Sequence, residues 1–115
     1  MRALIVALAL SLAACGGGQG ITGSNDDPFM EAFKEYAQEY ADCLNLGTVK
    51  VRFNADSGET PHCGAMPGGN LITCHGPVPF ANPTGIAAHE VCHLSGLGDE
   101  WEAELCAHEL LTTCK

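Results

Sequence analysis

The first regular pattern along the chain has a helical period. Apolar side chains recur every three or four residues, at Phe29, Phe33, Tyr36, Ala37, Tyr40 and Leu44. Asp27 followed by Pro28 is typical of a helix N-terminus, because the carboxylate can cap free N–H groups and proline has no amide hydrogen that needs an acceptor. These residues predict an amphipathic helix that has Asp27 as its N-cap, begins at Pro28 and ends near Gly47.

The next stretch has a two-residue period. Apolar and charged residues alternate over residues 48–53, which predicts a half-buried strand. Residues 58–69 are rich in glycine and proline and are predicted to form a loop, which contains His62 and Cys63. A second strand is predicted over residues 70–75. The sheet should therefore be short, with two or three strands.

A buried helix is predicted after this sheet, over residues 83–95. Asn82 and Pro83 repeat the capping signature, and most of the following residues are apolar. Gly96 and Gly98 can take positive φ and end the helix.

The last helix is predicted to start after Asp99, which is a second N-cap candidate, with Glu102 placed as in a capping box. Its apolar side is predicted to consist of Trp101, Leu105, Leu110 and Leu111. Taken together, the elements predict one small α+β domain over residues 28–115, with an N-terminal helix, a short sheet and two C-terminal helices.

The start of the chain has a different pattern. An apolar run of ten residues, 3–12, follows an arginine and ends in Leu-Ala-Ala-Cys at Cys15. This run is too short for a permanent membrane helix and is typical of a signal peptide. The cysteine context resembles the lipobox of bacterial lipoproteins, which implies a signal peptide over 1–14 and lipid on Cys15. A secretory signal cleaved nearby is the alternative. Residues 15–27 have few apolar side chains and are predicted to be a flexible tether.

If this resemblance holds, the mature protein is exported and anchored in a membrane. Gly16, rather than aspartate, follows the cysteine. By resemblance to lipoproteins of Gram-negative bacteria, this favours the outer membrane or the cell surface.

The other six of the seven cysteines lie in the predicted domain: Cys43, Cys63, Cys74, Cys92, Cys106 and Cys114. An even number in a small exported domain predicts three disulfides that staple the fold. Cys63 and Cys74 can close the loop between them. A structural zinc site made of cysteine and histidine is disfavoured, because no Cys-x-x-Cys spacing occurs.

The formal net charge is −9, and removal of residues 1–14 with their one arginine makes it −10. Such acidity excludes nucleic acid as a partner and disfavours electrostatic adhesion to anionic lipid. Basic peptides or proteins are the electrostatically favoured partners. On its own, the acidity can also serve only to keep an exported protein soluble.

The strongest chemical signal is His89-Glu90-x-x-His93. Residues four apart on a helix share one face, so the two imidazoles can bind one zinc ion. Glu90 adjoins them, and a carboxylate there can take a proton from a zinc-bound water. In this motif the chain resembles the zincin class of zinc metallopeptidases, which implies zinc as cofactor and Glu90 as the catalytic base. A chance match on a solvated helix is the alternative.

Two resemblances compete for the third zinc ligand. His-Glu-x-x-His-x-x-Gly-x-x-Asp resembles the metzincins and implies Asp99, but all three methionines precede the motif, where no methionine turn can form. Glu100-Trp101-Glu102-Ala103-Glu104 resembles the glutamate helix of gluzincins and implies Glu100, with Glu104 in a supporting position. Glu102 and Glu104 remain less favoured ligands. All four acids can instead be a negatively charged helix start that favours the dipole.

The resemblance also implies a function, which is peptide hydrolysis by a membrane-anchored zinc metallopeptidase acting on peptide or protein substrates. In zincins an extended substrate pairs with a strand above the active helix, and residues 70–75 are the candidate here. His62 and His75 are weak candidates for stabilising the oxyanion, and His108 is expected at the surface. The alternative function is a disulfide-rich surface lipoprotein that acts as a binding or inhibitor module, with a vestigial or structural metal site.

Overall fold

A computed structural model describes residues 27–114 of the chain. The predicted signal peptide, Cys15 and nearly all of the predicted tether lie outside these residues. None of the helices described is both long enough and apolar enough to cross a membrane.

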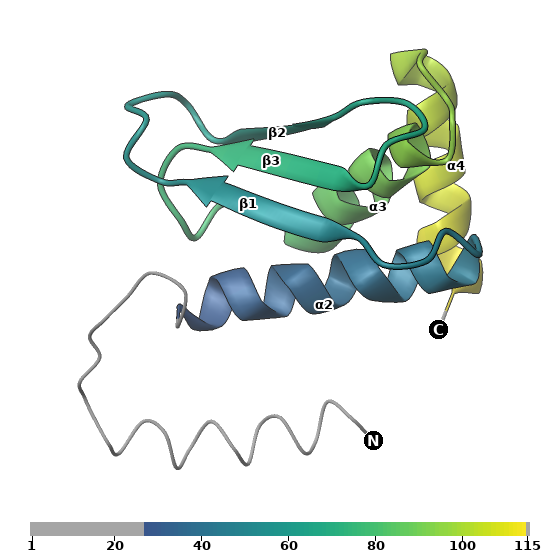
Figure 1. Cartoon of the computed structure of the whole chain (residues 1–115), viewed down its shortest axis with the longest axis horizontal. Helices are drawn as coiled ribbons and strands as arrows, with labels where there is room; N and C mark the ends of the chain where they lie inside the picture. The colour runs from purple at the N-terminus through teal and green to yellow at the C-terminus, as the bar shows by residue number, and fades with distance from the viewer. Residues whose placement is uncertain (1–26, 115) are drawn as a thin grey trace, which may run out of the picture.

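The described residues form three helices and one three-stranded sheet, in the order α2, β1, β2, β3, α3, α4 (Figure 1). Their bounds are α2 Pro28–Cys43, β1 Lys50–Asn54, β2 His62–Ala65, β3 Leu71–His75, α3 Pro83–Leu94 and α4 Glu100–Thr113. The predicted α+β class is therefore confirmed, including the N-terminal helix, the short sheet and the two C-terminal helices.

The N-terminal helix α2 starts as its sequence predicts. The Asp27 carboxylate accepts hydrogen bonds from the backbone N–H groups of Phe29 (2.8 Å) and Met30 (3.3 Å). The helix ends at Cys43, four residues before Gly47, because Asn45 takes a positive φ of 59° that no helix accommodates. The Gln38 side chain then fixes the connection to β1, donating to the carbonyl of Gly47 and accepting from the amide of Val49.

The sheet contains one strand that the sequence did not predict. Residues 62–65 lie in the predicted loop but form β2, which pairs antiparallel with β3 in a register that places Cys63 opposite Cys74. A disulfide joins these two cysteines. The strand is only four residues long and glycine interrupts its pattern, so its stability depends on β3 and the disulfide rather than on its own sequence.

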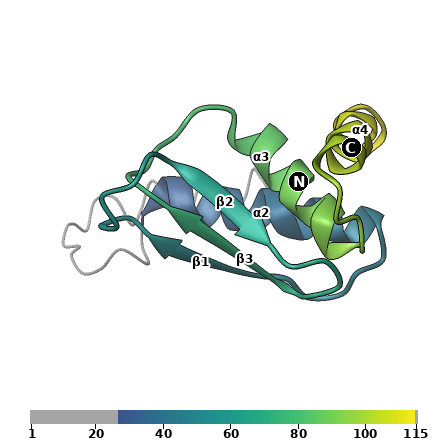
Figure 2. The ribbon, with the colours of Figure 1, turned by 90° about the horizontal axis from the view of Figure 1, so that it is seen from above.

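The strand order is β1-β3-β2, with β1 parallel to β3. This order makes β3 the central strand, paired on both sides. The prediction that residues 70–75 receive an extended substrate is therefore wrong, because the backbone of β3 has no free edge. β2 is the edge strand beside α3, and β1 is the edge on the far side (Figure 2).

Helices α2 and α3 cover one face of the sheet and form the core with it. Its largest fully buried side chains are Phe33 of α2, Ile72 of β3 and Val91 of α3. The predicted cap of α3 is wrong: Asn82 has a left-handed backbone (φ 54°) and its side chain makes no capping hydrogen bond. That side chain lies against Gly85 instead, where any Cβ would collide with it.

The last helix, α4, packs mainly on α3 rather than on the sheet. Three of the four apolar residues that the sequence places on its buried side are exposed: Trp101, Leu105 and Leu111. The buried side consists of Ala103, Ala107 and Leu110. These residues are spaced at i, i+4 and i+7, and the two alanines allow α4 to approach α3 closely. Bulky side chains at that contact would hold the helices apart.

Three disulfides staple the domain, as the cysteine count predicts. Cys43 with Cys114 joins the ends of α2 and α4, Cys63 with Cys74 joins β2 to β3, and Cys92 with Cys106 joins α3 to α4. The pairing that the sequence suggests for Cys63 and Cys74 is thus confirmed. Two of the three bonds hold α4, the element with the fewest neighbours.

Candidate metal centre

The helix α3 places its two motif histidines on one face. The ring centroids of His89 and His93 lie 4.8 Å apart, with the ring planes nearly perpendicular. His93 is buried and His89 is half-buried. Neighbouring positions on α3 pack into the core, so the helix cannot rotate without exposing apolar side chains. The backbone and the core therefore hold both imidazoles in place.

A tight turn brings a carboxylate opposite these rings. Gly96 (φ 117°) ends α3, and Asp99 caps α4 by accepting a hydrogen bond from the amide of Glu102 (2.9 Å). Glu100 is thus the first residue of α4. Its Oε1 lies 2.8 Å from Nε2 of His89, and its Oε2 lies 3.2 Å from Nε2 of His93.

These three side chains can hold a metal ion. One ligand atom from each of His89, His93 and Glu100 lies within 4.8 Å of the other two, and no other group in the described part of the chain meets this condition. The structure does not bring Asp99 into the group, because its carboxylate is engaged at the start of α4. Glu102 also lies outside it, and its side chain is exposed.

The outer nitrogens of both rings are also held. Nδ1 of His93 lies 2.6 Å from the carbonyl oxygen of Leu97, and Nδ1 of His89 lies 2.8 Å from Oε1 of Glu104. A carbonyl only accepts hydrogen bonds, so Nδ1 of His93 donates, and the Glu104 carboxylate sets the same arrangement for His89. A neutral ring held in this way has its lone pair on Nε2, where it can bind a metal ion, whereas the protonated ring of His89 donates from Nε2 to Glu100. The neutral arrangement is the one that metal-binding histidines usually have.

His89 and Glu100 each stabilise the charged form of the other. Burial of the ring lowers the pKa of His89, but hydrogen bonds to Glu100 and Glu104 outweigh that effect and raise the pKa above its usual value. The pKa of Glu100 is lowered, first by its hydrogen bond to His89 and then by His93. The exposed carboxylate of Glu100 therefore stays ionised, as it must be to bind a cation.

Glu90 differs from the other acids of the site because its carboxyl group is buried. The residue is only 6% exposed, and its Oε1 has no hydrogen-bond partner among the described residues. Burial raises its pKa to about 7, although the nearby histidines oppose this shift. A buried polar atom without a protein partner is rare, and a catalytic role, a water or an ion can account for it. Here it leaves an acceptor with a pKa near neutrality beside the metal ligands.

The remaining histidines lie elsewhere. His62 and His75 stack across β2 and β3 on the helix-free face of the sheet, with ring centroids 5.1 Å apart. His75 faces Asn54, and His62 faces Glu59, so neither belongs to the metal-binding group. His108 is exposed, as the sequence predicts, and approaches the outer oxygen of Glu104 at 3.4 Å.

Two parts of the site were missed by sequence reasoning. The carbonyl of Leu97 acts through the backbone, so no residue type could signal it. The free edge of β2 depends on a strand whose existence the glycines of residues 58–69 concealed. By contrast, the supporting position implied for Glu104 is where the structure places it, in contact with His89.

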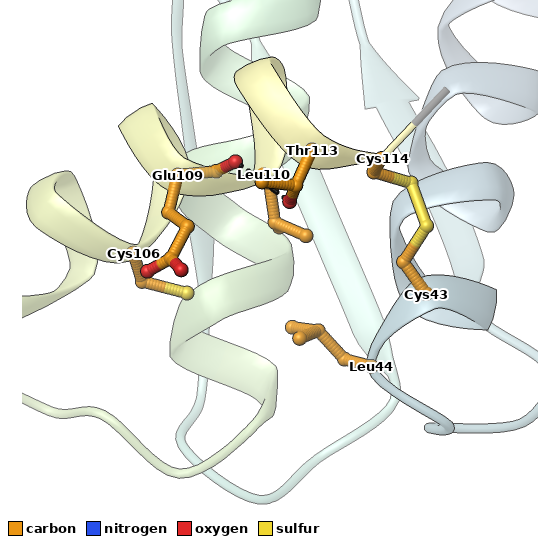
Figure 3. Close-up of a pocket in the computed structure, with 7 residues that line it drawn as sticks. All are labelled: Cys43, Leu44, Cys106, Glu109, Leu110, Thr113 and Cys114. Carbon is orange, nitrogen blue, oxygen red and sulfur yellow. Dashed lines mark hydrogen bonds between the residues drawn. A yellow bond between two sulfur atoms is a disulfide. The ribbon is translucent and has the colours of Figure 1, made fainter.

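A separate hollow of about 410 Å³ lies between the end of α2 and α4 (Figure 3). It is lined by Cys43, Leu44, Cys106, Glu109, Leu110, Thr113 and Cys114. The lining contains one carboxylate and no histidine, and its sulfur atoms are committed to disulfides. This hollow therefore offers no second metal site.

Comparison with known proteins identifies no relative of this chain. No model of a protein family matches the chain. No curated protein and no solved structure matches it either. The function must therefore be inferred from the chemistry of the site and from the His89-Glu90-x-x-His93 pattern.

Proposed function

We propose that this protein is a zinc metallopeptidase that hydrolyses peptide bonds while anchored to a membrane through lipid on Cys15. The main support for the proposal is that Nε2 of His89, Nε2 of His93 and the carboxylate of Glu100 lie close together. Nδ1 of each histidine is fixed by a hydrogen bond to a second group. The buried and unpartnered oxygen of Glu90 beside them supports it.

The donor set fits zinc. Two imidazoles and one carboxylate are a common set for catalytic zinc, which keeps a fourth position open for water. His89, His93 and Glu100 would hold the ion, and Glu104 would orient His89. When bound, zinc lowers the pKa of a coordinated water and polarises the scissile carbonyl. Glu100 is largely exposed, so solvent and substrate can reach the site from its side.

Glu90 would carry the proton through the reaction. In its ionised form it accepts a proton from the attacking water, and in its protonated form it gives that proton to the leaving amine. Burial raises the pKa of Glu90 to about 7 in the metal-free protein, and the positive charge of a bound zinc ion would lower it, which favours the ionised form that accepts the proton.

The free edge of β2 is where we expect the substrate to lie. Among the described strands, β2 pairs only with β3. Its connection to β3 is fixed to the end of α3 by a hydrogen bond from the amide of Gly68 to the carbonyl of Leu94 (3.1 Å). An extended peptide can add to that edge through backbone hydrogen bonds and pass beside α3. Acidic side chains on α4, such as Glu102 and Glu104, favour basic substrates.

A second candidate function is a binding or inhibitor module whose metal is only structural. The observation that favours it is that α4 has few neighbours besides α3. A metal bound by residues of both helices would hold the α3–α4 hairpin together, next to the Cys92–Cys106 disulfide. Such a role needs the three ligands but not Glu90.

The test that separates the two functions uses the mature, oxidised protein loaded with zinc. We expect about one zinc ion per chain and cleavage of a mixed peptide library. Glu90→Gln should retain the zinc and reduce the cleavage rate by roughly 10²–10⁴-fold, because the amide cannot accept the proton. Glu109→Gln, an exposed residue of α4 outside the candidate metal centre, is the matched control and should cleave normally. Zinc binding without any cleavage by the wild-type chain would favour the structural role.

A further inference from the structure

The basic residues of the described chain gather in one place. Lys34 of α2 and Lys50 and Arg52 of β1 are the only lysines and arginines of residues 27–114. All three line one hollow of about 340 Å³ at the free edge of β1, together with Met30, Val51, Phe53 and Leu71. We refer to this hollow as the cationic edge. In a chain with a net charge of −9, such a gathering is unexpected.

Among these cations, only Lys34 forms an ion pair within residues 27–114. Lys34 approaches Glu31 at 3.5 Å in an exposed pair, and such pairs contribute little. Lys50 and Arg52 form no ion pair with any other residue from 27 to 114. They alternate along β1 with Val51 and Phe53, which point to the core, so both project from the helix-free face. The cationic edge therefore presents positive charge beside an apolar floor.

Five acidic residues lie on the other side of the molecule, at α4, whereas Glu31, Glu35, Glu39 and Asp42 lie along α2. Helix α4 carries Glu100, Glu102, Glu104 and Glu109, with Asp99 at its cap. In Figure 2, β1 forms the edge of the sheet farthest from α3, and α4 lies beyond α3. The candidate metal centre thus lies among the acidic residues of α4, away from the cationic edge.

The chain enters the domain beside the cationic edge. Met30 and Lys34, which line the hollow, lie in the first two turns of α2. Only residues 16–27 separate this helix from Cys15, and twelve residues span at most roughly 40 Å when fully extended. Lipid attached at Cys15 would keep the cationic edge close to the membrane surface.

We propose that the cationic edge docks on the phosphate groups of the membrane that holds the anchor, so that the metal-binding site faces away from the bilayer. Positive side chains around an apolar floor fit the boundary between headgroups and acyl chains. The net negative charge of the chain opposes adhesion to an anionic membrane. Charges more than about 8–10 Å from the surface are largely screened at physiological ionic strength, so the charges at the contact determine whether it forms. The tether raises the effective concentration of the surface, which makes three cations sufficient.

The test uses the full lipoprotein in vesicles that carry a headgroup-attached quencher. Trp101 is the only tryptophan of the chain and is exposed on α4, so in the wild type it should remain unquenched. In the variant Thr48→Trp with Trp101→Phe, the introduced indole lies two residues before Lys50. It should be quenched in vesicles rich in phosphatidylglycerol, and not in phosphatidylcholine vesicles or at 1 M salt.

Charge variants then test the residues themselves. Adding Lys50→Gln and Arg52→Gln to this variant should lower the ratio of docked to undocked protein at least tenfold. Each basic residue near an anionic surface raises that ratio roughly fivefold. The control, Thr60→Glu with Thr112→Glu, changes the net charge equally but away from the cationic edge and should leave quenching unchanged.

The proposal rests on the lipid anchor, and the two can fail separately. A wild-type chain that does not float with vesicles would overturn the anchor and the docking together. A chain that floats but shows equal quenching in both lipids, or none, would overturn the docking alone. If polyglutamate binds the cationic edge while the charge variants leave quenching unchanged, the edge serves an acidic protein and the lipid proposal is wrong.

Discussion

The α3–α4 hairpin and the sheet contrast in how their side chains are brought together. In the hairpin, every residue of the candidate metal centre falls between positions 89 and 104, and helical spacing plus one tight turn assemble it. In the sheet, β1 pairs with β3 while β2 lies on the other side of β3, so neighbours in space are distant in sequence. The residues of the candidate metal centre therefore come from one short stretch of sequence, whereas the sheet beside them depends on contacts between distant segments.

The disulfides offer the largest test of this contrast. Cys63–Cys74 and Cys92–Cys106 close loops of similar length, with separations of 11 and 14 residues. Replacing either pair by alanine should therefore lower the free energy of unfolding by a similar amount, about 3 kcal/mol. Only the Cys92–Cys106 variant should also weaken metal binding, because that bond joins the two helices that carry the ligands.

Denaturant unfolding and a chelator competition on both variants would check this. A Cys63–Cys74 variant that loses metal as readily as the Cys92–Cys106 variant would show that the site depends on the sheet as much as on the hairpin.

Within the hairpin, Glu104 should strengthen metal binding by orienting His89. Glu104→Gln keeps the size of the side chain but weakens the charged hydrogen bond to Nδ1, so metal affinity should fall by about 10–100-fold. His108→Ala removes only the outer contact of Glu104 and should change affinity little. Equal losses in the two variants would mean that Glu104 acts through general charge rather than by orienting His89.

A smaller effect is expected from pH in the metal-free protein. The pKa of Glu90 is about 7 in the folded state and ordinary, near 4.5, in the unfolded chain. Folding therefore favours the protonated carboxyl group. Its contribution to stability is fully present below pH 4.5 and is lost as pH rises through 7.

Glu90→Gln should remove this loss. The variant should exceed the wild type in free energy of unfolding by roughly 1–3 kcal/mol at pH 8, since one pKa unit corresponds to about 1.4 kcal/mol, and by little at pH 5. Denaturant titrations of chelator-treated protein would measure both. A difference that does not change with pH would contradict the raised pKa.

The same contrast explains what could be predicted from the sequence. The starts of α2 and α4 follow from the caps at Asp27 and Asp99, and the extent of α3 follows from its apolar run and from Gly96, which the structure confirms. The proximity of Glu100 to the histidines follows from a short glycine turn. These features depend on residues within about one or two helical turns, where spacing alone fixes geometry.

The failures involve contacts between distant segments. β2 could not be predicted, because its pairing depends on β3 and on a disulfide rather than on its own four residues. The exposed side of α4 was misplaced because Trp101 and Leu105 are more apolar than Ala103 and Ala107, yet only the alanines fit closely against α3. Asn82 resembled a cap, but its left-handed backbone directs the side chain over Gly85.

The central claim is that Glu100 completes a metal centre with His89 and His93, while Asp99 only caps α4. The most direct measurement is zinc bound per chain during dialysis against increasing chelator, for Glu100→Ala and Asp99→Ala, alongside thermal unfolding. We predict that Glu100→Ala loses its zinc at much lower chelator concentration, because two histidines alone are a poor site. Asp99→Ala should retain zinc and lose about 0.5–2 kcal/mol of stability with its cap. If Asp99→Ala instead empties the site while Glu100→Ala stays loaded, the claim is wrong.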